Sequence, residues 1–163
     1  MANSLIATVS GNLSGSGQVI VENSAKATFT GAVAGSEQFV IENSASADMA
    51  SAVSGTGSFR LMNSAQLEFD KADTENVAFA AGGSETLRLG DAAQLSAAIA
   101  GFMNPDVIDL LGQKVASLSF SSGVLTVNLS GGTHETLDFS GSYTTASFKF
   151  ASDDHGGTNI LHT

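Results

Sequence analysis

Short apolar pairs recur along the first seventy residues, and one residue separates the two members of each pair. The pairs are Val19/Val21, Phe39/Ile41 and Phe59/Leu61, and Phe29, Met49 and Phe69 follow eight positions after their second members. A spacing of two is the strand period, and no set falls at the i, i+3, i+4, i+7 spacing of a helix. The pattern predicts short strands joined by corners rich in Gly, Ser and Asn.

The pattern repeats every twenty residues. Residues 7–26, 27–46 and 47–66 align without a gap, and each unit carries Asn-Ser-Ala near its end. A unit of this size cannot bury a core alone, but stacked units cover one another. We therefore predict an all-β fold, a parallel β-solenoid (β-helix) of about 20-residue coils. Right-handed coils are expected because parallel crossovers are usually right-handed.

Asn occupies one corner of every unit. In a parallel stack, equivalent positions lie about 4.8 Å apart. The sequence therefore predicts a structural ladder of side-chain amides made by Asn3, Asn23, Asn43 and Asn63. A second interpretation is that Asn tolerates the left-handed backbone of a corner. The two interpretations are compatible.

Beyond the regular repeats the pattern becomes weaker. We predict one domain over residues 1–163, with regular repeats in 1–70, an inserted polar loop in 71–86, and degenerate coils with a C-terminal cap in 87–163. Residues 87–95 resemble residues 59–67 at an offset of 28, and later apolar pairs continue near the period. About eight coils would make a rod roughly 40 Å long. Alanines in 92–102 favour a short helix as the alternative to a coil there.

Composition excludes several classes of function. The formal net charge of the 163 residues is −10, and the six Lys and Arg are scattered, which argues against nucleic-acid and anionic membrane surfaces. Cysteine is absent, so no disulfide or thiolate metal site is expected. No N-terminal signal peptide is visible, and no run approaches the roughly 20 apolar residues needed to span a bilayer, so we expect no membrane insertion.

Two C-terminal stretches resemble a known group of proteins. Residues 99–110, IAGFMNPDVIDL, resemble the "GF..GD.IDL" signature, and residues 151–160, ASDDHGGTNI, resemble the "SDGHGGT.I" closures, of large secreted bacterial β-solenoid proteins of the RTX and adhesin type. The resemblance covers roughly residues 87–163. It implies an extracellular or cell-surface bacterial protein that is exported by a type I pathway. The calcium-binding nonapeptide G-G-x-G-x-D is absent, so calcium between the coils does not carry over.

Acidic clusters supply the candidate metal ligands. Carboxylates and backbone carbonyls are the ligands that Ca²⁺ prefers. The candidate calcium ligands are Asp70, Asp73 and Glu75 in the predicted loop, and Asp153 and Asp154 in a Gly-rich turn. We expect no other cofactor.

The sequence offers little support for an enzyme. His134-Glu135 begins like a zinc-protease motif, but the second His is missing. Glu22 and Glu42 stand one period apart, but Met62 ends that column. We expect no enzyme.

A structural role explains the repeats best. We expect the segment Met1, Ala2, Asn3, Ser4, Leu5 and Ile6 to present an open strand edge through which chains join head to tail into extracellular fibres, with the chain itself as partner. The alternatives are an adhesin or carbohydrate-binding module that contacts cell-surface polysaccharide, and a C-terminal secretion or folding cap of a larger protein.

Overall fold

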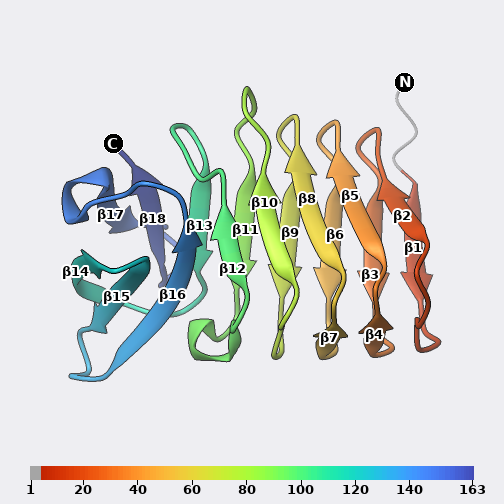
Figure 1. The fold of residues 1–163 in the computed structure, drawn as a ribbon, viewed down its shortest axis with the longest axis horizontal. Coiled ribbons are helices and arrows are strands. Elements are labelled where there is room, and N and C mark those ends of the chain that lie inside the picture. The colour runs from red at the N-terminus through yellow and green to blue at the C-terminus, as the bar shows by residue number, and fades with distance from the viewer. Residues whose placement is uncertain (1–4) are drawn as a thin grey trace.

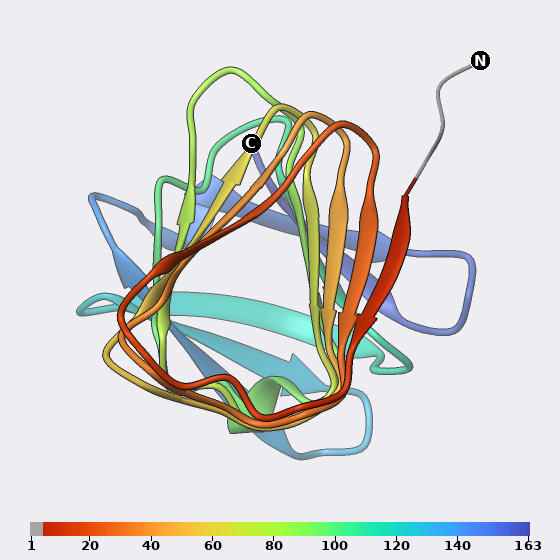
Figure 2. The same cartoon turned by 90° about the vertical axis from the view of Figure 1, so that its right-hand side faces the viewer.

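The computed structural model describes residues 5–163 and is a parallel β-solenoid of about five turns with coils of about 20 residues (Figure 1). The predicted fold class is therefore confirmed, with about five turns in place of the expected eight. Seen from the N-terminal side in Figure 2, the chain runs clockwise as it recedes, so the solenoid is right-handed.

Two eight-stranded sheets form opposite walls, and a small sheet forms a third side. Sheet I contains, in spatial order, β1 (Ile6–Val9), β3 (Lys26–Phe29), β6 (Ser46–Met49), β9 (Gln66–Phe69), β11 (Thr86–Leu89), β13 (Val107–Leu110), β18 (Thr158–His162) and β17 (Phe148–Ser152). Sheet II contains β14 (Val115–Ser121), β15 (Val124–Leu129), β16 (His134–Ser140), β12 (Ala98–Ala100), β10 (Asn76–Phe79), β8 (Ser58–Met62), β5 (Gln38–Glu42) and β2 (Gln18–Val21). Sheet III pairs β4 (Val33–Gly35) with β7 (Val53–Gly55).

The twenty-residue period sets the strand register. Ile6 pairs with Lys26, Lys26 with Ser46, and Ser46 with Gln66 along sheet I. Alternate residues of each strand point inward, which buries the apolar pairs read from the sequence. Phe39 and Phe59 are fully buried and stack with ring centroids 4.7 Å apart.

The fourth coil differs from the predicted inserted loop. Residues 71–86 contain β10, and Asp73 forms bridges to Val53 and Leu95, so the stack continues through this segment. Asp73 keeps the offset of 20 from Val53, Val77 pairs with Phe59 at an offset of 18, and Leu87 pairs with Leu67 at 20. Compared with the third coil, the corner between Asp73 and Val77 is two residues shorter, and the segment between Val77 and Leu87 is two residues longer. The alignment of 87–95 with 59–67 is therefore wrong.

The segment 92–102 forms part of a solenoid coil and not an α-helix. A single 3-10 turn, η1 (Ala92–Gln94), precedes the bridge at Leu95 and strand β12. Tertiary register therefore prevails over the helix propensity of the alanines.

The solenoid ends after β13, and the prediction of degenerate coils is wrong beyond this strand. β14, β15 and β16 form an antiparallel meander, and β17 and β18 form an antiparallel hairpin that pairs with β13. Ser122 and Gly123 both have positive φ between β14 and β15, which is the geometry of a two-residue hairpin. These strands form the C-terminal cap that the sequence analysis also expected (Figure 1).

Aromatic rings fill the core beneath the cap. Phe139 lies 5.1 Å from Phe148 and 5.4 Å from Tyr143 between ring centroids, and Phe148 lies 5.4 Å from Phe120. The Tyr143 hydroxyl, in the turn before η2 (Thr145–Ser147), donates to the carbonyl of Phe102 at 3.0 Å. This cluster closes the apolar interior at one end.

Candidate functional site

The first coil presents apolar side chains at the end opposite to the cap. Leu5 is 66% exposed and Ile6 is 76% exposed, and Val9 and Ile20 are also exposed. Leu5, Val9, Val19 and Ile20 border a hollow of about 390 Å³ whose floor includes Phe29. We call this surface, Leu5, Ile6, Val9, Val19 and Ile20, the open end. Val9 and Val19 continue the buried columns of Phe29 and Phe39 and so resemble the cross-section of a core, whereas Ile6 and Ile20 lie on the outer faces of β1 and β2.

Strand edges accompany these side chains. Within residues 5–163, β1 and β2 are the outermost strands of sheets I and II at the open end. The carbonyls of Leu5 and Val9 accept hydrogen bonds from Lys26 and Thr30 of the second coil. Because backbone groups of successive strand residues point to opposite edges, Ile6 and Thr8 direct their amides and carbonyls outward. The open end therefore offers a template for another strand.

The predicted assembly edge is described only in part. Leu5 and Ile6 lie in the exposed first coil, whereas Met1, Ala2, Asn3 and Ser4 lie outside the described residues, and the assembly edge stays a prediction. Val9 and Ile20 belong to the same surface but were not in the predicted edge. Period-two alternation could have found Ile20, because it faces outward between Val19 and Val21.

At the corner that contains Asn23, Asn43 and Asn63, the structure shows both a left-handed backbone and a hydrogen bond between side-chain amides. Asn23, Asn43 and Asn63 have φ of 57°, 55° and 53°, and the Ser residue after each is also left-handed. The Asn63 Nδ2 donates to the Asn43 Oδ1 at 3.0 Å. Asn is thus selected by the left-handed turn and also links neighbouring coils. Asn3 lies outside the described residues.

The N-terminal group of candidate calcium ligands is divided by the fold. Asp70 is exposed, whereas Asp73 and Glu75 are fully buried. The amide of Glu75 donates to Asp73 Oδ1 at 3.0 Å, and Asp73 Oδ2 has no hydrogen-bond partner. Burial raises the pKa of Asp73 to about 7, against the lowering effect of the Glu75 amide.

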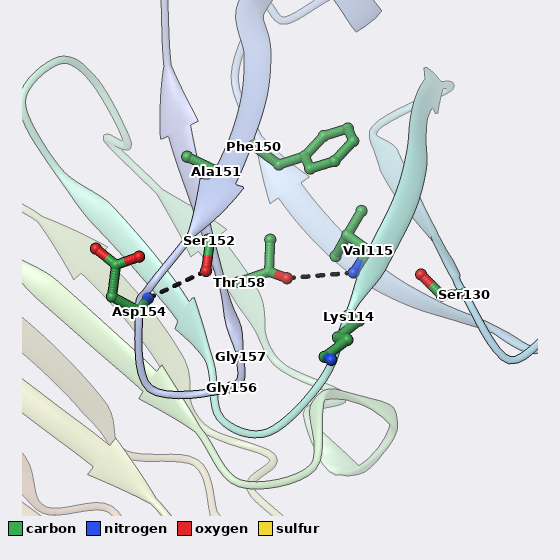
Figure 3. A pocket seen from close by; sticks show the side chains of 10 residues that line it. All are labelled: Lys114, Val115, Ser130, Phe150, Ala151, Ser152, Asp154, Gly156, Gly157 and Thr158. Carbon is green, nitrogen blue, oxygen red and sulfur yellow. Dashed lines mark hydrogen bonds between the residues drawn. The ribbon is translucent and has the colours of Figure 1, made fainter.

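The C-terminal pair lies in a tight turn. Asp153 Oδ1 accepts the amides of His155 at 2.7 Å and Gly157 at 2.8 Å, and the His155 amide is the largest cause of the lowered pKa of Asp153. Beside this turn is a cleft of about 470 Å³ lined by Lys114, Phe150 and Thr158 (Figure 3). Asp154 also lines this cleft, and its carboxylate points away from Phe150 and Val115 in Figure 3.

A column of alternating Gly and Glu runs through the corner before sheet II. The strand register places Glu37 beside Gly57 and Gly57 beside Glu75. Glu37 and Glu75 are buried, and a Cβ on Gly57 would lie 2.6 Å from Glu75 Oε2 and would overlap the carbonyl of Glu37. Each Glu side chain therefore occupies space left by a glycine. Sequence analysis missed this column, although the alternation at positions 17, 37 and 57 could have indicated it.

The remaining acidic and histidine candidates from the sequence do not gather into a site in the described residues. His134 and Glu135 lie on strand β16, and Glu135 accepts a hydrogen bond from Gln113. Glu42 pairs with Met62 in the strand register. Across residues 5–163, no group of three His, Asp or Glu side chains is arranged to hold a metal ion. The calcium ligands stay a prediction.

No helix in the described part of the chain is long and apolar enough to cross a membrane.

No protein-family model matches the chain, and no curated protein matches it.

Proposed function

We propose that this chain is a structural protein whose copies join end to end through the open end. The observation that carries the proposal is the coincidence, at the open end, of exposed Leu5 and Val9 beside the hollow with the outward edges of β1 and β2. Apolar side chains supply the driving force for association, and strand edges supply its direction.

The capped end offers strands of matching direction. β17 is antiparallel to β18, which is antiparallel to β13, so β17 runs in the direction of the coil strands of sheet I. The same reasoning through β16 and β15 gives β14 the direction of sheet II. A head-to-tail contact would therefore continue both sheets with parallel strands, as the sequence analysis expected.

The outer edges of β17 and β14 are not equally accessible to another strand. The Thr145 hydroxyl accepts the amide of Phe120 at 2.9 Å, and β14 carries a bulge between Val115 and Ser117. Bulges and covering groups hinder strand pairing. The contact between β17 and the β1 of a second copy is consequently the central element of the proposal.

Assembly can be tested by electron microscopy and sedimentation of the full chain, with calcium and with chelator. Leu5→Lys should abolish fibres while the monomer keeps its β-sheet circular dichroism, because Leu5 is 66% exposed in the monomer and borders the hollow that a second copy would cover. Met103→Lys is the matched control, since Met103 is 41% exposed and lies between β12 and β13. A wild-type chain that stays monomeric at all concentrations would refute the proposal. Fibres that persist in Leu5→Lys would exclude the open end as the contact.

A second candidate function is supported by the cap. An antiparallel closure at one end and an open coil at the other are what the last segment of a longer β-solenoid requires. Placing additional 20-residue repeats before residue 7 would then raise the melting temperature without producing fibres.

A carbohydrate-binding role has one supporting feature. The cleft beside β17 is lined by Phe150, which is 42% exposed, and by Lys114. Saturable glycan binding that is lost in Phe150→Ala would favour this role. Extracellular location and type I export are proposals that rest on the resemblance of residues 87–163 alone.

A further inference from the structure

Glu85 and Asp106 lie side by side where the fourth and fifth coils join, because the pairing of Thr86 with Val107 puts the two preceding residues in register. Glu85 is 0% exposed and Asp106 is 1% exposed. The Glu85 amide donates to Asp106 Oδ1 at 3.1 Å, and Asp106 Oδ2 accepts the amide of Met103 at 3.0 Å. Glu85 Oε1 accepts the amide of Ser64 at 3.3 Å, and the buried Oε2 has no hydrogen-bond partner.

These carboxylates replace backbone carbonyls of the regular repeat. In the earlier coils, the amides of Ser24 and Ser44 donate to the carbonyls of Asn43 and Asn63 in the next coil. The following corner is two residues longer, and the Ser64 amide meets the Glu85 carboxylate there. Gly83 provides the space, because a Cβ at this position would overlap that carboxylate.

Within the part of the chain that the structure describes, no cation acts on Glu85 to neutralise the pair. Ser64 from the Asn corner is uncharged, and the groups that act on Glu85 are its own burial, Asp106 and backbone amides. Tyr143, from the cap, faces Asp106 and is held by the carbonyl of Phe102. Arg88, on the neighbouring strand β11, is paired with Glu68 and Asp109. Two adjacent buried carboxylates cannot both remain charged at low cost.

We propose that Glu85 and Asp106 hold one proton between them at neutral pH, and that this shared proton fastens the fourth coil to the fifth. The proton passes to solvent when the pair ionises. The two carboxylates then repel each other, and the corner that contains Ser64, Glu85 and Met103 loosens. Acid therefore strengthens this joint, independently of whether the open end assembles.

The electrostatics of Glu85 agree with this geometry. Burial, with a further contribution from the neighbouring Asp106 carboxyl, raises the pKa of Glu85 to about 7 from an ordinary 4.5. A raised carboxyl pKa favours the folded state below pH 4.5, and this contribution is lost as the pH rises through 7.

The test compares the wild type with Glu85→Gln between pH 4 and 9. Glutamine keeps an acceptor for Ser64 and carries a permanent donor toward Asp106, as the protonated acid does. The melting temperature of the wild type should fall relative to Glu85→Gln by roughly 5 °C or more between pH 5 and 8. The control is Glu22→Gln, because Glu22 is exposed on a corner, and its pH profile should follow the wild type.

A direct readout covers the case in which Glu85→Gln fails to fold. The carboxyl carbon of Glu85 in the wild-type chain can be titrated by ¹³C NMR. A midpoint near 7 would support the shared proton. A midpoint below 5, or parallel melting profiles of wild type and Glu85→Gln, would overturn it.

Discussion

Phe59 lies over Phe39 with the ring centroids 4.7 Å apart and the ring planes 15° from parallel. Phe29 and Phe69 meet this pair edge-on at 5.5 and 5.1 Å. The period of twenty residues places the two stacked rings one coil apart, and the four rings, from two positions of the repeat, connect three successive coils.

The stacked rings allow a direct test of the core. Phe59→Ala should lower the free energy of unfolding by about 3–5 kcal/mol, because it leaves a cavity between fully packed coils. Urea denaturation measures the change. Arg60→Ala, on the exposed face of the same strand, is the control and should change stability by less than about 0.5 kcal/mol. Equal effects of the two substitutions would show that this column is not the core.

The Asn corner can be separated into its two contributions. Asn43→Ala should cost about 2 kcal/mol, because it loses the hydrogen bond from Asn63 and places a Cβ-bearing residue without a compensating amide at a φ of 55°. Asn43→Gly should cost about half as much, because glycine accepts the left-handed backbone. Thermal or urea unfolding of the pair measures both values. If the two variants were equally destabilised, backbone strain would contribute nothing.

Arg88 forms ion pairs with acidic residues of the neighbouring strands on the outer face of sheet I. It pairs with Glu68 and, at 3.2 Å, with Asp109. Burial raises the pKa of Glu68, and Arg88 lowers it. Arg88→Met should therefore cost about 1 kcal/mol at pH 7, an effect reduced because these side chains are partly exposed. Lys71→Met removes an exposed positive charge as the control, and a similar loss there would indicate general charge repulsion.

The pH dependence of stability can show whether the buried Asp73 carboxyl carries a proton or binds a calcium ion. Its raised pKa of about 7 contributes stability that is present below pH 3.8 and is lost as the pH rises through 7. Asp73→Asn should therefore be more stable than the wild type by about 1–3 kcal/mol at pH 8 and about equal at pH 4. Denaturation with urea at both values measures this difference. If calcium stabilised the wild type at pH 8 but not Asp73→Asn, so that the variant became the less stable of the two, the result would instead support the calcium ligand predicted from the sequence.

The first three coils could be predicted because each repeats the same residues at the same positions. The fourth could not, because both sheets contribute strands with the same alternation. Leu87 and Leu89 fit the pattern of Phe59 and Leu61 as well as that of Leu67 and Phe69, and only the pairing of Leu87 with Leu67 decides between them. The shortened and lengthened corners cancel, so the period hides both changes.

The cap and the buried acids escaped prediction for different reasons. Spacing alone does not tell a parallel coil from an antiparallel hairpin, and the Ser122-Gly123 turn was the signal for the hairpin. Glu85 and Asp106 look like ordinary surface acids in the sequence. Their burial follows from the need to pair the amides of Ser64, Met103 and Glu85 where the regular ladder is interrupted.

The alternation of Glu37, Gly57 and Glu75 gives the solenoid a second, longer period. Duplicating a single coil would set Glu against Glu or Gly against Gly at this corner, which would crowd two side chains or leave a void. Duplicating two coils together would preserve the fit. The unit by which this protein could grow, through recombination or by engineering, is therefore about forty residues, although the sequence repeats every twenty.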